Sequence, residues 1–215
     1  MNGIGVFGKL PARGDFVAQG LPPFFTDAWH GWLVRGLADA RLLLGERLAE
    51  VWRVAPAWRF LLAPGLSGPV AAAGVLVPSV DAVGRAFPLT LARLAAEPLE
   101  PLGLLAGPPW LDRLEAAARA ALVPDLDLEV WLAELRAMAP ERPPVAAPPP
   151  LPLRLFGEAG GLAPRLAEAL VARGGHGLAL FWSAGSPYVA AGLLASLGLP
   201  EGRDFVRLLS DRGGT

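Results

Sequence analysis

Two long stretches of the chain contain no charged residue, 60–80 and 174–200. A long stretch without charges is normally buried away from water, either in a protein core or in a lipid bilayer. Prolines and glycines interrupt the first stretch from Pro64 onward, and both residue types break helices and mark turns. This pattern predicts a buried β-hairpin, with strands near 58–63 and 70–77, and argues against a membrane-spanning helix.

The second stretch is interrupted by turn residues as well. It carries glycines throughout, and Ser186-Pro187 has the form of a helix start, with a serine N-cap and a proline in the first helical position. We therefore expect a buried strand at 178–182, a turn, and a helix at 187–197. Neither stretch is expected to insert into a membrane.

Helical and strand-like patterns alternate along the rest of the chain. Asp127 is a predicted N-cap, and Pro88 suggests that its strand lies at a sheet edge. Apolar spacing predicts strands at 4–7, 86–94 and 153–156, and helices at 24–45, 46–54, 110–122, 128–139 and 162–173.

Intermixed strands and helices are buried most simply when helices cover a central sheet. The expected fold class is therefore α/β, a three-layer sandwich with a central mixed sheet flanked by helices. A chain of 215 residues is long enough for one well-buried core, and we expect a single domain over 1–215. Clustered prolines predict an extended connector at 140–152.

Composition excludes several classes of function. The formal net charge is -1 and Lys9 is the single lysine, which argues against binding to nucleic acid or to an anionic membrane surface. Cysteine is absent, which excludes disulfides, thiolate metal sites and a cysteine nucleophile. The first residues contain charges and no apolar run typical of a signal peptide, so we expect a cytoplasmic protein.

Catalytic patterns fail for lack of context. Residues 3–8 spell G-x-G-x-x-G, but the phosphate-binding form of this motif needs a strand before it and a helix after it. His30 and His176 lack the spacing of a metal site and are expected at the protein surface. Nothing in the sequence supplies a nucleophile, a base and an oxyanion donor together, so we expect no catalytic residue, metal or cofactor.

Trp29 and Trp32 are three residues apart and therefore share one helix face. Burial in the core is the usual fate of such large apolar side chains. The alternative is an exposed groove for a partner, formed together with Phe24 and Phe25.

Charged residues gather in two loops that flank apolar strands. Lys9, Arg13 and Asp15 lie in the first loop, and Asp81 and Arg85 lie in the second. One interpretation is a structural ion-pair cluster that fixes the loops. In such a cluster an aspartate of either loop pairs with Arg13, Arg59 or Arg85. The other interpretation is a docking surface for a partner.

The chain also resembles a known family. The run VFGKLPARGDFV at 6–17 resembles the opening of the TagF (ImpM) proteins of bacterial type VI secretion systems. The resemblance continues through GLP at 20–22, WHGWL at 29–33, APAWRF at 55–60, GVLVPSVD at 74–81, VGR at 83–85 and FPLT at 87–90. A looser match, LFWSAGS at 180–186, extends it across nearly the whole chain.

The resemblance implies regulation and no catalysis. TagF-like proteins act in the cytoplasm as post-translational repressors of type VI secretion, through the FHA-domain scaffold of the apparatus, and their fold is an α/β sandwich. Since no catalytic residues are carried over, the matched loops are the predicted interaction surface. The predicted partner-binding residues are Lys9, Arg13, Asp15, Asp81 and Arg85.

Two alternatives stay open. One is a small hydrolase or nucleotide-binding protein that uses Ser79 with Asp81 and Arg85. The other is a structural subunit of the secretion machine. Loss of a repressor should raise secretion, whereas a structural subunit should be incorporated stoichiometrically into the machine.

Overall fold

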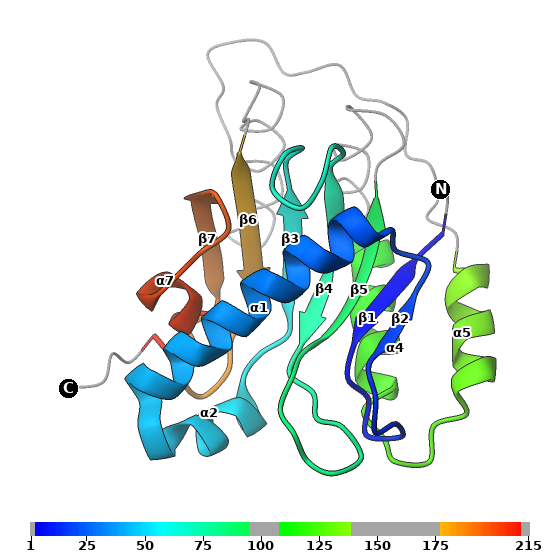
Figure 1. The fold of residues 1–215 in the computed structure, drawn as a ribbon, viewed down its shortest axis with the longest axis horizontal. Coiled ribbons are helices and arrows are strands. Elements are labelled where there is room, and N and C mark those ends of the chain that lie inside the picture. The colour runs from blue at the N-terminus through cyan, green and yellow to red at the C-terminus, as the bar shows by residue number, and fades with distance from the viewer. Residues whose placement is uncertain (1–2, 95–107, 139–176, 212–215) are drawn as a thin grey trace.

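The computed structural model describes residues 3–94, 108–138 and 177–211 (Figure 1). Its strands are β1 Gly5–Gly8, β2 Val17–Gln19, β3 Trp58–Leu62, β4 Ala72–Val77, β5 Leu89–Leu94, β6 Leu178–Ser183 and β7 Gly192–Leu197. Its helices are α1 Pro23–Leu44, α2 Leu48–Val54, α4 Pro108–Ala120, α5 Leu128–Ala137 and α7 Arg203–Val206, with a 3-10 turn at Gly45–Arg47. The predicted hairpin of β3 and β4 is confirmed. The predicted connector, the strand at 153–156 and the helix at 162–173 lie outside the described residues.

The strands form one sheet in the order β2-β1-β5-β4-β3-β6-β7, and every pairing between neighbours is antiparallel. The α/β class is confirmed, but the expectation of a mixed sheet is wrong. A helical connection creates a parallel pair only where the two strands that it joins are neighbours. Here α1 and α2 join β2 at one edge to β3, and β1, β5 and β4 lie between them. Figure 1 shows α1 crossing the sheet diagonally.

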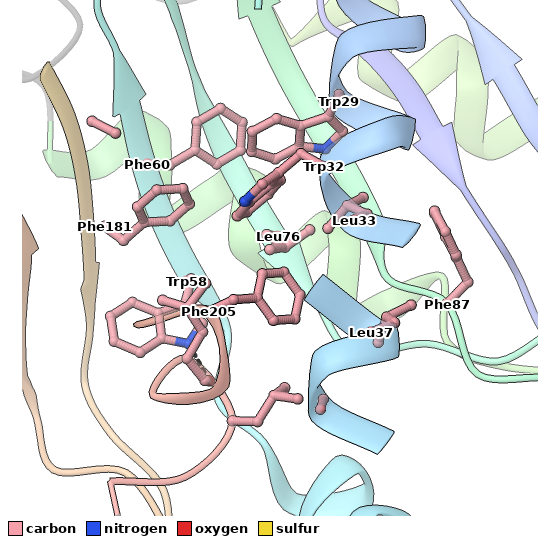
Figure 2. Packing of buried hydrophobic residues seen from close by; sticks show 14 of the residues in the cluster. Trp29, Trp32, Leu33, Leu37, Trp58, Phe60, Leu76, Phe87, Phe181 and Phe205 are labelled. Atoms are coloured by element: carbon pink, nitrogen blue, oxygen red, sulfur yellow. Dashed lines mark hydrogen bonds between the residues drawn. The ribbon is translucent and has the colours of Figure 1, made fainter. Parts of the chain in front are cut away.

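The face of the sheet beneath α1 holds an aromatic core (Figure 2). Trp29 and Trp32 are 0% and 1% exposed, which confirms their predicted burial. Trp29 Nε1 donates to Thr90 Oγ1 at 2.9 Å, and Trp32 Nε1 donates to the Pro200 carbonyl at 2.7 Å. Buried indoles usually have such partners. These bonds tie α1 to β5 and to the segment before α7.

Helices α4 and α5 pack against the opposite face of the sheet. Leu114 of α4 and Trp131 of α5 belong to a core cluster that also contains Leu61 of β3. The neighbours of Leu61 along the strand, Phe60 and Leu62, belong to the cluster beneath α1. Alternation of side chains between the two faces of a strand produces this division.

Residues 187–197 do not form the predicted helix. The strand β7 begins at Gly192, and before it Ser186 Oγ accepts a hydrogen bond from the Tyr188 N–H in a tight turn. A Cβ on Gly185, whose φ is +87°, would lie 2.7 Å from the Ala191 nitrogen, so the chain closes tightly on itself here. An apolar run of this length fits a helix or a buried strand equally well, and serine–proline is also typical of turns.

The strand predicted at 86–94 begins later, at Leu89, and lies between β1 and β4 rather than at an edge. Pro88 precedes the first pair of the ladder, so its missing N–H removes no ladder hydrogen bond.

Within the described ranges, no helix combines the length and the apolar character that crossing a bilayer requires.

Candidate protein-interaction surface

Two loops meet at one end of the sheet. The first follows β1 and contains Lys9, Arg13 and Asp15, and the second joins β4 to β5 and contains Asp81 and Arg85. The last residues of β1 and of β4 both pair with the first residue of β5. The antiparallel ladder therefore brings together two loops that are far apart in the sequence.

An ion-pair cluster centred on the buried Asp81 joins these loops. Lys9 Nζ donates to Asp81 Oδ2 at 2.8 Å, and Arg85 Nε donates to the same oxygen at 2.6 Å. Asp81 Oδ1 accepts from the N–H groups of Val83 and Arg85 at 3.1 and 2.8 Å. The predicted pairing of Asp81 with Arg85 is confirmed, and Lys9 adds a second cation to it.

The surroundings of Asp81 keep its carboxylate ionised. Burial raises the pKa of this carboxyl, but hydrogen bonds from Lys9, from the main chain and side chain of Arg85 and from the Val83 N–H lower the pKa by more. The net result is a pKa well below the usual range of aspartate. Asp81 therefore remains a fixed anion for both cations at neutral pH.

Main-chain groups of the two loops are also cross-linked. Ser79 Oγ donates to the Lys9 carbonyl at 2.7 Å. The Ala82 N–H donates to the Arg13 carbonyl at 2.9 Å, and Arg85 Nη2 donates to the Gly14 carbonyl at 2.8 Å. Because these bonds connect the loops at several points, the loops form a single structural unit.

The predicted residues divide into two groups by exposure. Lys9 and Asp81 are only 8% and 2% exposed. Arg13 and Asp15 are exposed, and the Arg85 side chain is 63% exposed. The structure therefore brings the predicted residues together, but it presents only Arg13, Asp15 and Arg85 to solvent. The buried pair of Lys9 and Asp81 lies beneath these exposed residues and holds their loops in place.

Arg59 lies outside this cluster, although it was considered as a partner for the loop aspartates. Its guanidinium contacts Asp112 Oδ1 at 2.6 Å and Glu115 Oε2 at 3.0 Å. Both carboxylates belong to α4, so Arg59 attaches this helix to β3.

An aromatic cluster borders the loops, and sequence reasoning missed it. The Phe16 ring is 43% exposed and lies 4.8 Å from the ring centroid of Phe87 and 5.6 Å from that of His30. Lys9 Nζ lies 5.4 Å from the Phe16 centroid, within the range of a cation–π contact. His30 is exposed, as expected. The sequence feature that could have predicted this cluster is the phenylalanine at the end of each charged loop, Phe16 in the first and Phe87 in the second.

A groove of about 760 Å³ runs beside the second loop. Glu46, Trp52 and Arg53 line one side, and Ser79 and Val80 line the other. Trp52 Nε1 donates to the Ser79 carbonyl at 3.1 Å and joins the two sides. The groove thus borders the same loop unit that carries the charged residues.

Fold and surface together define an α/β protein with a seven-stranded antiparallel sheet and a cross-linked pair of charged loops at one end. A family model described as "TagF N-terminal domain, Type VI secretion system-associated" matches residues 5–138, and the chain belongs to this family. The match includes both charged loops.

The chain is also similar to a solved structure, the 2.05 Å crystal structure of PA0076 from Pseudomonas aeruginosa PAO1. The two chains are 36% identical with a TM-score of 0.80, and the similarity covers 99% of this chain and 96% of that chain. No curated protein matches the sequence significantly.

Proposed function

We propose that this protein is a non-enzymatic, post-translational repressor of type VI secretion. Its family is associated with that secretion system. The proposed partner is the FHA-domain scaffold of the apparatus, which it meets in the cytoplasm. The proposed contact surface consists of Arg13, Asp15 and Arg85, held in position by the buried pair of Lys9 and Asp81.

The observation that supports this proposal is the display of scarce charges on loops that are cross-linked by an ion-pair cluster centred on the buried Asp81. Loops fixed in advance lose less conformational entropy when a partner binds. A surface that carries both signs of charge contributes orientation and specificity, since only a complementary pattern matches it. Both properties are typical of selective protein recognition.

The alternative of a hydrolase that uses the same loop has less support. Ser79 is 5% exposed, and its hydroxyl donates to the main chain of Lys9. Both oxygens of Asp81 are engaged by cations and N–H groups. An activated serine needs a base within hydrogen-bond reach of its hydroxyl, and the contacts of Ser79 and Asp81 hold the loops together.

We further propose that the complete chain forms a single three-layer sandwich. Residues of α1, α2 and α7 belong to one core cluster, and residues of α4 and α5 belong to the other. Such a body would hold the loop unit rigidly against the sheet.

An exchange of charges tests the proposed contact surface. Arg13→Asp combined with Asp15→Arg keeps the net charge and reverses the local pattern. We expect this double variant to fold normally and to bind the purified scaffold about tenfold more weakly or worse. Arg113→Glu, at an exposed arginine of α4, is the control and should leave binding unchanged. Unchanged binding by the folded double variant would contradict the proposal.

Two further measurements separate the alternatives. Deletion of the gene should raise secretion, and the charge-exchanged variant should fail to restore repression. Loss of secretion on deletion would favour a structural subunit. Thermal stabilisation of the pure protein by nucleotides or phosphate esters would favour the enzyme, because a ligand that binds the native state raises its stability.

A further inference from the structure

The two edges of the sheet are built differently. At one edge β2 has three residues, and its Gln19 Oε1 accepts from Arg136 Nη2 of α5 at 3.2 Å. At the other edge β7 has six residues, and no strand of the described part of the chain pairs with its outer side. Proteins usually keep an edge strand from pairing with other chains by making it short, charged or proline-containing. The strand β7 has none of these features.

The hydrogen bonds to β6 show which groups of β7 face outward. In an antiparallel ladder, residues that bond to the neighbouring strand alternate with residues whose N–H and C=O point away from it. The Gly198 N–H donates to the Gly177 carbonyl at 2.6 Å, so Gly198 and every second residue before it face β6. Leu193, Ala195 and Leu197 therefore turn their N–H and C=O groups to the open edge.

The side chains at this edge are exposed and apolar. Leu197 is 85% exposed, and Ala195 is also exposed. Leu193 is half-buried against the core cluster beneath α4 and α5. Since side chains alternate along a strand, all three lie on that same face. No charged residue occurs anywhere from Ser183 to Pro200, so this segment carries no charge of its own that would repel an identical segment.

We propose that β7 pairs with β7 of a second copy of this chain, antiparallel and centred on Ala195. Ala195 then lies opposite Ala195 of the second copy, and Leu193 lies opposite Leu197 of the second copy. Every outward N–H and C=O group of the strand finds a partner in this register. The pairing continues the antiparallel order of the sheet across a twofold axis, in which the same patch of both copies meets itself.

Apolar contacts add to the hydrogen bonds of this pairing. Each exposed Leu197 side chain would contact the Leu193 side chain directly opposite, on one face of the joined sheet. Opposed apolar pairs are a main source of stability between antiparallel strands. The second copy is thus favoured over an unrelated strand, because the apolar pattern and the outward groups of β7 complement themselves.

Sedimentation of the full chain tests the proposal. We expect a species of twice the 22.5 kDa mass at high protein concentration, which dissociates on dilution. Leu197→Lys should shift the protein to a single copy under the same conditions. Leu42→Lys makes the same chemical change at an equally exposed leucine of α1, 83% exposed, and should leave the association unchanged.

Cysteine cross-linking tests the register separately, because the natural chain has no cysteine. Opposed residues of a hydrogen-bonded pair have Cα atoms about 5.5 Å apart, within the range that a disulfide spans. Ala195→Cys should therefore form a covalent dimer on mild oxidation. Leu197→Cys should not, because the two copies of residue 197 would lie more than about 13 Å apart along the strands.

Each outcome decides the proposal. Concentration-dependent doubling that Leu197→Lys abolishes, together with cross-linking of Ala195→Cys alone, supports it. A wild-type protein that stays a single copy at every concentration overturns it, as does equal cross-linking of both cysteine variants. A folded Leu197→Lys protein that still doubles would place the interface elsewhere. If Leu197→Lys fails to fold, the cross-linking of Ala195→Cys and Leu197→Cys decides whether the proposed pairing occurs.

Discussion

Gly36 of α1 lies directly against the Phe205 ring of α7. A Cβ on Gly36 would lie 2.2, 2.3 and 2.4 Å from three atoms of the Phe205 ring, far inside van der Waals contact. The ring cannot swing aside freely, because it packs edge-on against Trp32 with the ring centroids 5.3 Å apart. Overpacking of this kind costs roughly 1–3 kcal/mol, whereas alanine gains up to about 1 kcal/mol over glycine within a helix. Gly36→Ala should therefore lower the free energy of unfolding by about 1 kcal/mol, and Tm by about 2–4 °C.

The decisive test is whether the effect of Gly36→Ala on the free energy of unfolding changes sign when the Phe205 ring is removed. In the Phe205→Ala background only the helix preference remains, so Gly36→Ala should stabilise the protein by up to about 1 kcal/mol. Gly31→Ala on the same helix is the control, because its Cβ would meet only the flexible end of Arg35 at 3.3 Å, and it should stabilise both backgrounds. Urea unfolding followed by tryptophan fluorescence reports the free energies, since Trp32 lies in the contact. A stabilising Gly36→Ala in the wild-type background, or a destabilising one without the ring, would refute this reasoning.

Two further predictions concern polar groups inside the protein. Because the pKa of Asp81 is lowered in the folded state, its contribution to stability should be present at neutral pH and lost as the pH falls below about 4. The difference in Tm between the wild type and Asp81→Asn should therefore narrow in acid, and a constant difference would show that the charge is not responsible. Trp29→Phe should leave the buried Thr90 hydroxyl without its donor and cost about 1–3 kcal/mol from that loss. The double variant with Thr90→Val should cost less than the sum of the single variants in urea unfolding, and simple additivity would contradict the role of this bond.

Local patterns in the sequence were sufficient for most elements of the fold. The spacing of Trp29 and Trp32 predicted a buried helix face, and the prolines and glycines of the first charge-free stretch predicted the hairpin of β3 and β4. Asp127 caps α5 as predicted, since its Oδ1 accepts from two N–H groups of the first turn. Each of these predictions depends on residue types and spacings within one short segment of the chain.

The failures share a different physical cause, which is that the outcome depends on how the strands pair and not on the local pattern of apolar residues. The run that forms β7 has no strong intrinsic preference for either helix or strand, and its pairing with β6 determines that it forms a strand. The direction of pairing likewise depends on which strands become neighbours. The hairpins and the long crossing of α1 make all pairings of the described strands antiparallel.

The candidate site shows the same division between local and long-range information. The ion pair of Asp81 with Arg85 spans four residues and was predictable. The burial of Lys9 was not, because lysine is almost never fully buried unless it is paired, and its partner lies 72 positions away. Sequence reasoning therefore identified the right loop residues without separating the buried anchors from the exposed charges.

The two proposed surfaces are spatially separate, and this makes the proposals independently testable. The charged loops adjoin β1, β4 and β5, whereas β7 is three strands beyond β4. At about 4.8 Å per strand the open edge lies at least about 14 Å from those loops, so pairing through β7 leaves the loops free. The charge exchange at Arg13 and Asp15 should thus leave the mass unchanged, and Leu197→Lys should leave the affinity of one loop surface unchanged. A dimer formed through β7 would carry two loop surfaces, so an assembly that contains more than one scaffold molecule would bind it with greater avidity than it binds a single surface. Leu197→Lys should remove this gain in avidity and leave the affinity of each single loop surface unchanged.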